Sequence, residues 1–468
     1  MTNQARKIGA GGRGARSPVV AALLSFVWPG LGQWYAGRPR SAVIVALPVL
    51  FVVLLLVIWL AGGLAQALID LLAPPAAVAF IIIVALEGAW RIAALVHAAI
   101  AAVGNDPARL RRVSVTGPIL LLTILVAASH LWAISVAWSL YNASAQMFVG
   151  DSRPLASTAP GGSAPLGSDG FAASPGATPE SVNSRINILL TGIDSSATRE
   201  HALTDTLIVL TVDPTTGKAA MISFPRDIAR FKIWDGRTYY GKINSLLTYA
   251  NTHPSEYPEG GLPTLTHELG FLLGVPIHYY AAVDLQGFVQ LVDAVGGVTV
   301  DNPRAIDDPG YGGWTDGRIG FTLSAGVHKL DGQTALAYAR SRKGNGDNDF
   351  TRARRQQQLL VAMRDRLTDP SLLIKLPSII TTASAILRTN FPQDRVSEML
   401  TLGQKVSGDD LTKQVVLGPP YALNPPAGTP GGYQLVLDMN RLAKLSIDIF
   451  GPDSSYSTAH ASASPPPP

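Results

Sequence analysis

The chain has 468 residues, more than one ordinary domain, and 47% of them are apolar. Together with a positive mean hydropathy, this indicates a membrane protein rather than a large soluble enzyme. A formal net charge of +4 is too small to indicate nucleic-acid binding by itself, and the absence of cysteine excludes disulfides and thiolate metal sites.

The chain begins with a basic tail, residues 1–17. Within it, residues 9–14 read GAGGRG and match a dinucleotide-binding fingerprint. No strand precedes this motif and an apolar segment follows it, so we interpret it as part of a flexible tail.

Three apolar segments follow, at about residues 41–62, 76–103 and 118–139. Each is long enough to cross a bilayer core of about 30 Å, and their number argues against a cleaved signal peptide. An earlier segment, residues 19–35, is interrupted by Pro29 and two glycines and has basic residues on both sides. We expect it to be re-entrant or interfacial, with a true span as the alternative.

Charge predicts how these segments cross the membrane, because basic residues in short loops prefer the cytoplasm. The connection at residues 61–75 contains no basic residue, whereas residues 109–112 contain three. With the N-terminus inside, three crossings place everything after residue 141 outside the membrane. Inside the second span, Glu87 and Arg91 are four residues apart and are expected to pair, with contact to a lipid headgroup as a weaker hypothesis.

Residues 142–184 are rich in Ser, Pro, Gly and Ala, a composition that cannot bury a core, so we interpret them as a linker. In residues 185–455, strand and helix patterns are mixed, which predicts one α/β domain with a layered mixed sheet flanked by helices. The expected strands are residues 186–190, 206–212, 219–224, 277–285 and 298–300, and the expected helices include residues 262–273 and 356–367. From residue 456 we expect a disordered tail.

Residues 338–357 contain five arginines. Arg340 and Arg342 follow an apolar stretch and would project from one face of a strand, while Arg352 and Arg355 share one face of the next helix. Guanidinium groups stay charged and offer paired donors that match phosphate oxygens, so the cluster predicts a pyrophosphate clamp. The alternative is a solvated basic helix face, which explains Arg354 well.

Acidic residues occur at the expected strand ends. Asp194 follows the first strand and Asp205 lies just before the next, and such carboxylates suit a hard cation such as Mg²⁺ or Mn²⁺. Turn capping is the alternative for either residue alone. Arg226 and Asp227 end a third strand and add an arginine and an acid to what could be the same sheet edge.

Other motifs do not support a function. The sequence contains no strand-borne Gly-x-Ser-x-Gly elbow, His-Glu-x-x-His helix or Walker lysine. Asp347 and Asp349 could bind calcium, although a solvated turn is the simpler interpretation.

Several motifs of residues 185–367 resemble those of the LytR-CpsA-Psr family, membrane-anchored enzymes that attach glycopolymers to peptidoglycan. The resemblance is specific because the motifs fall in the family's order. They are residues 189–194 (LLTGID), 204–206 (TDT), 224–227 (FPRD), 242–244 (KIN), 283–288 (VDLQGF), 292–298 (VDAVGGV) and the arginine segment. We expect a member of the actinobacterial type, without the additional C-terminal domain that some of those members carry.

The resemblance implies transfer of a glycopolymer from a polyprenyl-pyrophosphate carrier to a peptidoglycan sugar hydroxyl, with magnesium near the pyrophosphate. Asp194 and Asp205 match the family's metal-site acids. The residues that match its phosphate-binding arginines are Arg226, Arg340, Arg342, Arg352 and Arg355. Lys242, Asn244 and Gln356 are expected to bind substrate.

One departure from the family concerns the residue before the Thr-Asp-Thr motif, often an arginine and here Leu203. Arg199 is a candidate substitute. The general base is open between Asp194 and Asp227.

Together these features predict a multi-pass protein of the cell membrane whose extracytoplasmic domain is a metal-dependent phosphotransferase. Its partners would be the lipid-linked glycan, peptidoglycan and the membrane, without nucleic acid. The rival functions are a polyprenyl-pyrophosphate pyrophosphatase and a non-catalytic glycan-binding or regulatory protein. Candidate walls for an apolar lipid groove, with ordinary core as the alternative, are Leu246, Leu247, Leu269, Phe271, Leu272 and Phe288.

Overall fold

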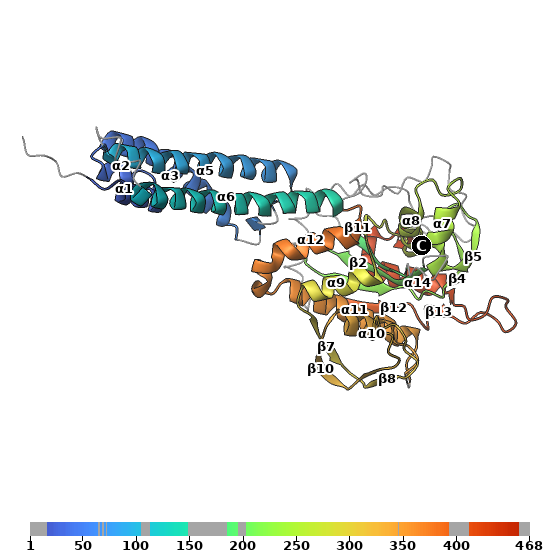
Figure 1. The fold of residues 1–468 in the computed structure, drawn as a ribbon. Coiled ribbons are helices and arrows are strands. Elements are labelled where there is room, and N and C mark those ends of the chain that lie inside the picture. Colours follow the sequence, from blue (N-terminus) through green and yellow to red (C-terminus); the bar gives the residue numbers. More distant parts are fainter. Residues whose placement is uncertain are drawn as a thin grey trace, which may run out of the picture. The chain divides into compact units, whose positions relative to one another are not determined.

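The computed structural model describes residues 16–63, 66, 67, 70, 71, 73–103, 113–147, 185–194, 203–344, 346–392 and 411–457 (Figure 1). The chain divides into two compact units, Met1–Asn142 and Ala143–Pro468. We call them the helical unit and the α/β unit and describe each by itself. Most of the predicted linker lies outside the described residues, and the predicted domain boundaries stay a prediction.

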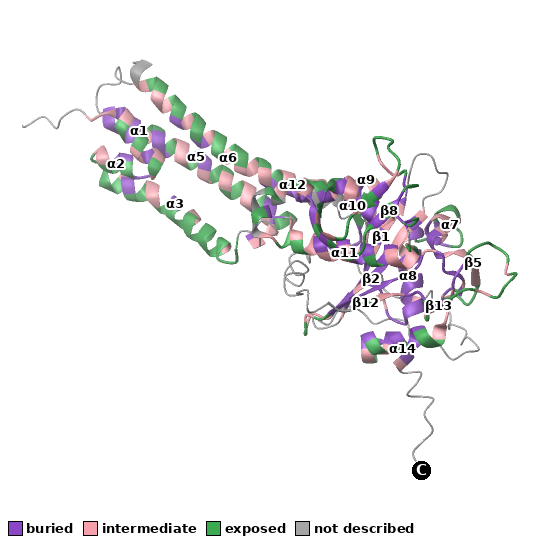
Figure 2. Ribbon diagram, turned by 90° about the horizontal axis from the view of Figure 1, so that it is seen from below, coloured by how far each residue is buried: buried purple, intermediate pink, exposed green. Residues whose placement is uncertain are grey.

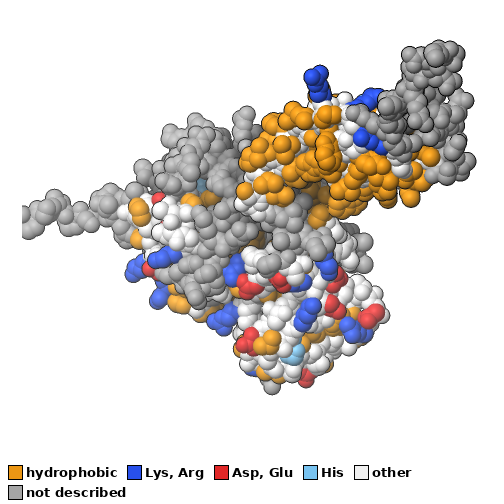
Figure 3. All heavy atoms as spheres, turned by 90° about the vertical axis from the view of Figure 1, so that its left-hand side faces the viewer, with side chains coloured by type: hydrophobic (Ala, Val, Ile, Leu, Met, Phe, Trp, Pro, Cys, Tyr) orange, Lys and Arg blue, Asp and Glu red, His pale blue; other side chains and the backbone are white. Residues whose placement is uncertain are grey.

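The helical unit contains α3 (Pro39–Leu60), α5 (Pro74–Val103) and α6 (Val113–Met147). Among the described residues, three helices are long and apolar enough to cross a membrane, and they correspond to the three predicted spans. Many of their apolar side chains are exposed, as Figures 2 and 3 show. A surface of this kind suits lipid, and the chain is a membrane protein.

The interrupted apolar segment before these spans forms two short helices, α1 (Pro18–Val27) and α2 (Leu31–Tyr35). The break contains Gly30, whose φ of 107° is a conformation that favours glycine. Alone, α1 has 10 residues, about 15 Å of helix, which is too short to cross a bilayer core. The depth of this hairpin in the membrane stays a prediction.

Polar side chains connect the helices of this unit. Glu87 lies 3.6 Å from Arg91, as expected, and its Oε2 also lies 2.5 Å from Nε2 of His130 on α6. Arg91 donates to the carbonyl of Phe26 near the end of α1, at 3.2 Å. We call Glu87, Arg91 and His130 the helical cluster. It links α1, α5 and α6.

The α/β unit is built on a six-stranded mixed sheet in the order β11-β6-β1-β2-β3-β12. Strands β1 and β6 are parallel, as are β3 and β12, while the other pairs are antiparallel. The strands are β1 (Ile186–Asp194), β2 (Leu203–Val212), β3 (Ala219–Ser223), β6 (Tyr279–Asp284), β11 (Leu387–Thr389) and β12 (Leu411–Val416). This mixed α/β architecture confirms the predicted fold class.

Alternate residues of the sheet face two helical layers. Leu189, Val209 and Ile222 pack in one core with residues of α7, α8 and α14, and a second core lies among α9, α10, α11 and α12. The helices are α7 (Leu246–Thr252), α8 (Gly261–Leu273), α9 (Leu285–Ala294), α10 (Gly332–Arg340), α11 (Asp349–Leu367), α12 (Leu376–Ile386) and α14 (Met439–Phe450).

Small hairpins and single turns complete the unit. The hairpins are β4 (Ala229–Lys232) with β5 (Thr238–Lys242), β7 (Val298–Asn302) with β10 (Gly326–Leu330), β8 (Ile306–Asp308) with β9 (Phe321–Leu323), and β13 (Ala422–Leu423) with β14 (Val436–Leu437). The 3₁₀ turns are η2 (Ile243–Ser245), η3 (Pro370–Lys375) and η5 (Gly451–Asp453).

Two expectations are corrected by the structure. The strand predicted to carry Arg340 and Arg342 is wrong: α10 ends at Arg340, and Arg342 lies in the loop beyond it. Asp331 caps the N-terminus of α10 and an Ala-rich run continues it, a short apolar pattern that periodicity assigns poorly. The tail expected from Tyr456 also begins later, because Tyr456 is 4% exposed and donates to the carbonyl of Leu272.

Candidate functional site

Three strand ends meet at one edge of the sheet. Asp194 ends β1 and pairs with Leu203 at the start of antiparallel β2, which places Asp205 nearby. The segment after β3, residues 224–227, continues at the same edge because Phe224 N–H donates to Leu207 O at 2.8 Å. The predicted juxtaposition of Asp194, Asp205 and Asp227 near one edge therefore follows from strand register.

Arg226 connects two of the acids. Its Nη1 lies 2.7 Å from Oδ1 of Asp205, and its Nε lies 3.7 Å from Oδ2 of Asp227. Burial by itself lowers the pKa of Arg226, but the combined attraction of Asp205, Asp349 and Asp227 outweighs burial and the net pKa is raised. The guanidinium is thus held charged between the two carboxylates.

Arg340 approaches the same edge from α10. Its Nη2 lies 3.1 Å from Oδ2 of Asp194, whose side chain is only 2% exposed. The Arg340 side chain is 27% exposed, so this guanidinium joins a buried acid to the solvent side of the site.

Arg352 lies in the first turn of α11 and is buried. Its Nη1 lies 3.0 Å from Oδ1 of Asp349. Burial lowers the pKa of Arg352, opposed by Asp349, and the charges of Arg226, Asp205 and Asp227 also act on it. Arg352 therefore lies within electrostatic range of Arg226 and its two acids.

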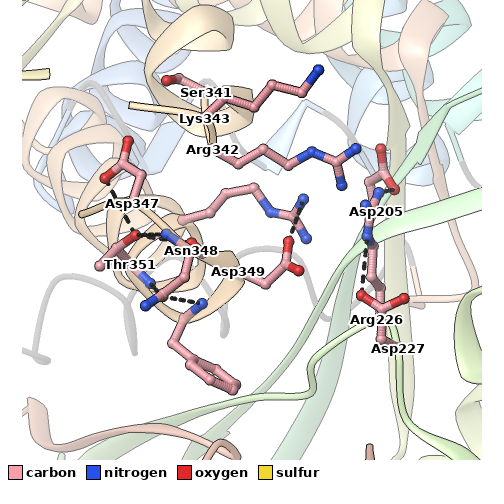
Figure 4. A network of polar contacts seen from close by, with 12 residues as sticks. Asp205, Arg226, Asp227, Ser341, Arg342, Lys343, Asp347, Asn348, Asp349 and Thr351 are labelled. Carbon is pink, nitrogen blue, oxygen red and sulfur yellow. Dashed lines mark hydrogen bonds and ion pairs between the residues drawn. The ribbon is translucent and has the colours of Figure 1, made fainter. Parts of the chain in front are cut away.

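Arg342 is exposed, and Figure 4 shows its side chain directed toward Asp205 and Arg226. With the residues that the structure describes, it forms no ion pair. The turn that carries it is held by Asp308, whose Oδ2 accepts from Ser341 Oγ at 2.9 Å and from the N–H groups of Arg342 and Lys343 at 3.1 Å. Sequence reasoning missed Asp308, because nothing marks it apart from neighbouring Asp307.

Arg355 has a different set of partners. Its Nη1 lies 3.2 Å from Oδ2 of Asp347, and its Nη2 donates to the carbonyl of Ser341. Burial lowers its pKa, against the attraction of Asp347. In this structure Arg355 stabilises the loop between α10 and α11. Its contact with phosphate stays a prediction. Arg354 is exposed, in agreement with the solvated interpretation.

Asp347 and Asp349, the candidate calcium ligands, are each paired with an arginine. Asp347 contacts Arg355 and Arg304, the latter at 3.5 Å, and Asp349 contacts Arg352. In the described part of the chain, no group of three or more His, Cys, Asp or Glu could hold a metal ion. Their geometry therefore favours a structured basic loop over a calcium site.

The residues expected to bind substrate lie at different depths. Lys242, at the end of β5, reaches Oδ1 of Asp227 at 2.5 Å and is 33% exposed. Asn244 is buried and its carbonyl accepts from Thr204 Oγ1 at 3.3 Å. Gln356 donates to Ala339 O at 3.3 Å, which fixes α11 against α10. Only Lys242 among these three touches an acid of the site.

Asp194 and Asp205 suit the chemistry of a hard cation, because carboxylate oxygens on adjacent strands are the ligands that Mg²⁺ prefers. Each is paired with an arginine, and no third protein ligand joins them among the described residues. A cation held by these two acids would share them with the arginines and take its remaining ligands from phosphate oxygens and water.

The departure at Leu203 is seen at the first residue of β2, and Arg199 lies outside the described residues.

The residues considered as walls of a lipid groove belong to the two hydrophobic cores. Leu246, Leu247, Leu269 and Leu272 are buried in the core beside α8, with Phe271 packed against it, and Phe288 packs against the second core. This is the ordinary-core alternative.

Comparisons with known proteins agree on a family. The family model described as LytR_cpsA_psr matches residues 168–418. The chain is 34% identical over 223 residues to TagV of Bacillus subtilis, named a polyisoprenyl-teichoic acid–peptidoglycan teichoic acid transferase, covering 47% of this chain and 53% of TagV. It is 34% identical over 213 residues to the TagU of Halalkalibacterium halodurans, which bears the same functional name, covering 46% of this chain and 63% of that protein.

The crystal structure of B. subtilis TagV superposes with a TM-score of 0.45 and 29% identity, covering 57% of this chain and 98% of that one. The chain spans between half and two thirds of the length of these curated relatives. Because the family model covers more than half of the residues, the chain belongs to the LytR_cpsA_psr family.

Proposed function

We propose that the chain is a membrane-anchored phosphotransferase that moves a glycopolymer from a polyprenyl-pyrophosphate carrier to a sugar hydroxyl of peptidoglycan. The relatives TagV and TagU are named as teichoic acid transferases of this kind. An anionic glycopolymer is therefore the substrate class we propose, and an actinobacterial subtype stays a prediction.

One observation carries the proposal. Guanidinium groups from three separate segments pair with acids at or beside one sheet edge. Arg226 after β3 contacts Asp205, and Arg340 at the end of α10 contacts Asp194. Arg352 at the start of α11 contacts Asp349, whose charge also acts on Arg226. Arg342 adds an exposed guanidinium directed toward them (Figure 4). Paired, rigid donors on several sides suit a diphosphate better than one carboxylate.

In the proposed reaction, the acceptor hydroxyl oxygen bonds to the sugar-linked phosphorus. The bond from that phosphorus to the bridging oxygen breaks, and polyprenyl phosphate leaves with that oxygen. Arg226, Arg340, Arg342 and Arg352 would stabilise the charge that develops on the phosphate oxygens. Donors fixed before the reaction need not reorganise, which is why a folded arginine cluster lowers the barrier.

Asp194 and Asp205 would hold Mg²⁺ or Mn²⁺, which when bound would neutralise charge on the diphosphate. The arginines that pair with these acids would then share them with the cation. Loss of transfer after metal removal by a chelator, with recovery on adding Mg²⁺ or Mn²⁺, is the measurement that supports this part.

Asp227 is our choice for the proton acceptor. Its side chain is 8% exposed and its partner Lys242 is 33% exposed, whereas Asp194 is 2% exposed and bound to Arg340, so Asp227 lies nearer to solvent. Transfer must fall much more in Asp227→Asn than in Lys242→Met if the carboxylate itself accepts the proton.

The membrane helices and the charge pattern support a position of this site on the outer face of the cell membrane. There the domain would meet both the lipid-linked glycan and peptidoglycan. Protease accessibility of residues after 184 in intact spheroplasts tests this orientation, and protection of the domain would contradict it.

The full-length protein in detergent micelles, supplied with lipid-pyrophosphate glycan, peptidoglycan oligomers and Mg²⁺, tests the function. We expect glycan attached to peptidoglycan by wild type, loss in Arg340→Ala, and near-normal transfer in the surface control Arg354→Ala. Released phosphorylated glycan with none attached would indicate the rival pyrophosphatase. Unchanged cellular function in Asp194→Asn would favour the non-catalytic rival.

A further inference from the structure

Two exposed tyrosines lie beside the acids of the site. Tyr240 on β5 is 67% exposed and Tyr433, just before β14, is 55% exposed. Among the described residues of the α/β unit, they are the two exposed aromatic side chains. Large exposed rings cost free energy in water, so their presence at a site suggests a ligand.

Arg230 connects the segments that carry these rings. Its Nε donates to Gln434 Oε1 at 3.1 Å and its Nη2 donates to Pro430 O at 2.9 Å. Its guanidinium carbon lies 5.8 Å from the centre of the Tyr240 ring. We call Tyr240, Arg230 and Tyr433 the tyrosine platform.

The backbone at Arg230 is strained. Its φ of 58° is the single left-handed value found for a non-glycine residue in the described part of the chain. Such a conformation is unfavourable for a residue with a side chain and persists where surrounding contacts require it. Here those contacts are the hydrogen bonds to Gln434 and Pro430, which hold the β14 segment against β4.

The platform is continuous with the site. Leu435 N–H donates to Asp227 O and Ala229 N–H donates to Leu435 O, both at 2.9 Å, so Tyr433 lies two residues from a direct backbone partner of Asp227. Partial burial raises the pKa of Tyr433, and the charges of Asp349 and Asp227 add to that shift. Its phenol is therefore within electrostatic range of two acids of the site.

Tyr240 lies on the strand that supplies Lys242. The register between β4 and β5 shifts between Tyr239, opposite Phe231, and Lys242, opposite Ala229, so Tyr240 lies at a bulge two residues before Lys242. Lys242 reaches Asp227. The bulged strand thus connects the platform to the carboxylate that we assign as proton acceptor.

We propose that the tyrosine platform binds a pyranose ring of the acceptor glycan strand. A pyranose has an apolar face of C–H groups that stacks on aromatic rings, and hydroxyl groups that bond to guanidinium and amide groups such as those of Arg230 and Gln434. The proposal rests on the proposed function, because the reacting hydroxyl must come within hydrogen-bond reach of Asp227. Tyr433 lies beyond residue 418, where the family match ends.

Binding of soluble peptidoglycan glycan oligomers to the full-length protein, without lipid donor, is the first test. We expect Tyr240→Ala and Tyr433→Ala each to weaken binding about fivefold to tenfold, and the corresponding Phe variants to bind within about twofold of wild type. Val327→Ala, an exposed apolar residue on β10, is the control and is expected to bind normally. Equal binding by wild type and both Ala variants would overturn the platform.

Arg230→Gly tests the positioning role, because glycine accepts the left-handed backbone while the guanidinium is lost. In the transfer assay we expect a higher KM for the acceptor, with kcat and the KM for the lipid donor unchanged. A higher donor KM instead would assign the platform to the donor glycan and overturn our assignment. Binding without any transfer would contradict the proposed function but leave the platform intact.

Discussion

The helical unit and the α/β unit each contain a cluster of charged side chains. The two clusters differ in whether every charged side chain has an ion-pair partner. Glu87, Arg91 and His130 contact one another and a helix carbonyl, and together they link three helices. The arginines of the α/β unit also pair with acids, yet Arg342 is exposed and has no ion-pair partner among the described residues. Each side chain of the first cluster has an ion-pair partner within the cluster, whereas the second also offers an exposed charge to a ligand.

Charged side chains therefore have different roles in the two units. A charge within an apolar helix bundle must find a partner inside the protein, since lipid supplies none. A charge at a sheet edge near water can remain available to an incoming anion. Variants in the two clusters should therefore affect different measurements.

The largest effect is expected from breaking the helical cluster. Glu87→Ala leaves His130 and Arg91 without their acid, and removing one partner of a buried pair costs about 3 to 5 kcal/mol. Unfolding in mixed micelles measures this loss. The double variant Glu87→Leu with His130→Leu should recover part of the stability, because it removes both partners. A Glu87→Ala variant as stable as wild type would show that the cluster does not stabilise the helical unit.

The next effect concerns activity rather than stability. Arg352→Ala should reduce kcat about 10²- to 10³-fold, equivalent to about 2.7 to 4 kcal/mol, because a fixed donor to the phosphate oxygens is lost. Arg354→Ala on the same helix is the matched control and should stay within about twofold. Transfer kinetics with matched unfolding curves separate the two clusters, and an equal loss in both variants would refute a specific role for Arg352.

A smaller effect is expected at the support of the loop. Asp308→Ala leaves the donors of Ser341, Arg342 and Lys343 unpaired, at a cost of about 1 to 3 kcal/mol. Both stability and transfer should fall, because Arg342 loses its fixed turn. Asp307→Ala, on the exposed neighbour, should change neither; if it matches Asp308→Ala, the hydrogen bonds of Asp308 are unimportant.

The last effect depends on pH and is small within any single pH unit. Glu268 is fully buried in the core, and burial raises its pKa well above 4.5, with the Trp234 backbone opposing the shift. The folded state therefore keeps a proton that the unfolded state releases, so stability is greatest below pH 4.5 and falls as pH rises toward the folded pKa. The slope is about 1.4 kcal/mol per pH unit.

Glu268→Gln should remove this dependence. The free energy of unfolding of the variant, relative to that of wild type, should therefore rise from pH 4.5 to pH 7. Urea unfolding of both proteins across that range measures the difference. Parallel stability curves would show that Glu268 ionises normally in the folded protein.

The sequence by itself determined the membrane helices, because length and apolar composition are local properties that need no partner. It also located four of the six sheet strands, β1, β2, β3 and β6, the helices α8 and α11, and the motif residues Asp194, Asp205 and Arg226. It did not predict the edge strands β11 and β12. It mistook the segment before Arg340 for a strand, since a short apolar run fits either structure.

Only the tertiary structure decided which arginine meets which acid. Arg340 contacts Asp194 across 146 positions, and no local pattern encodes a contact at that separation. The support from Asp308, the cluster with His130 and the approach of Tyr433 to Asp227 likewise arise from packing. Local propensity selects helices and strands, whereas the meeting of distant side chains depends on strand register and on how the layers pack.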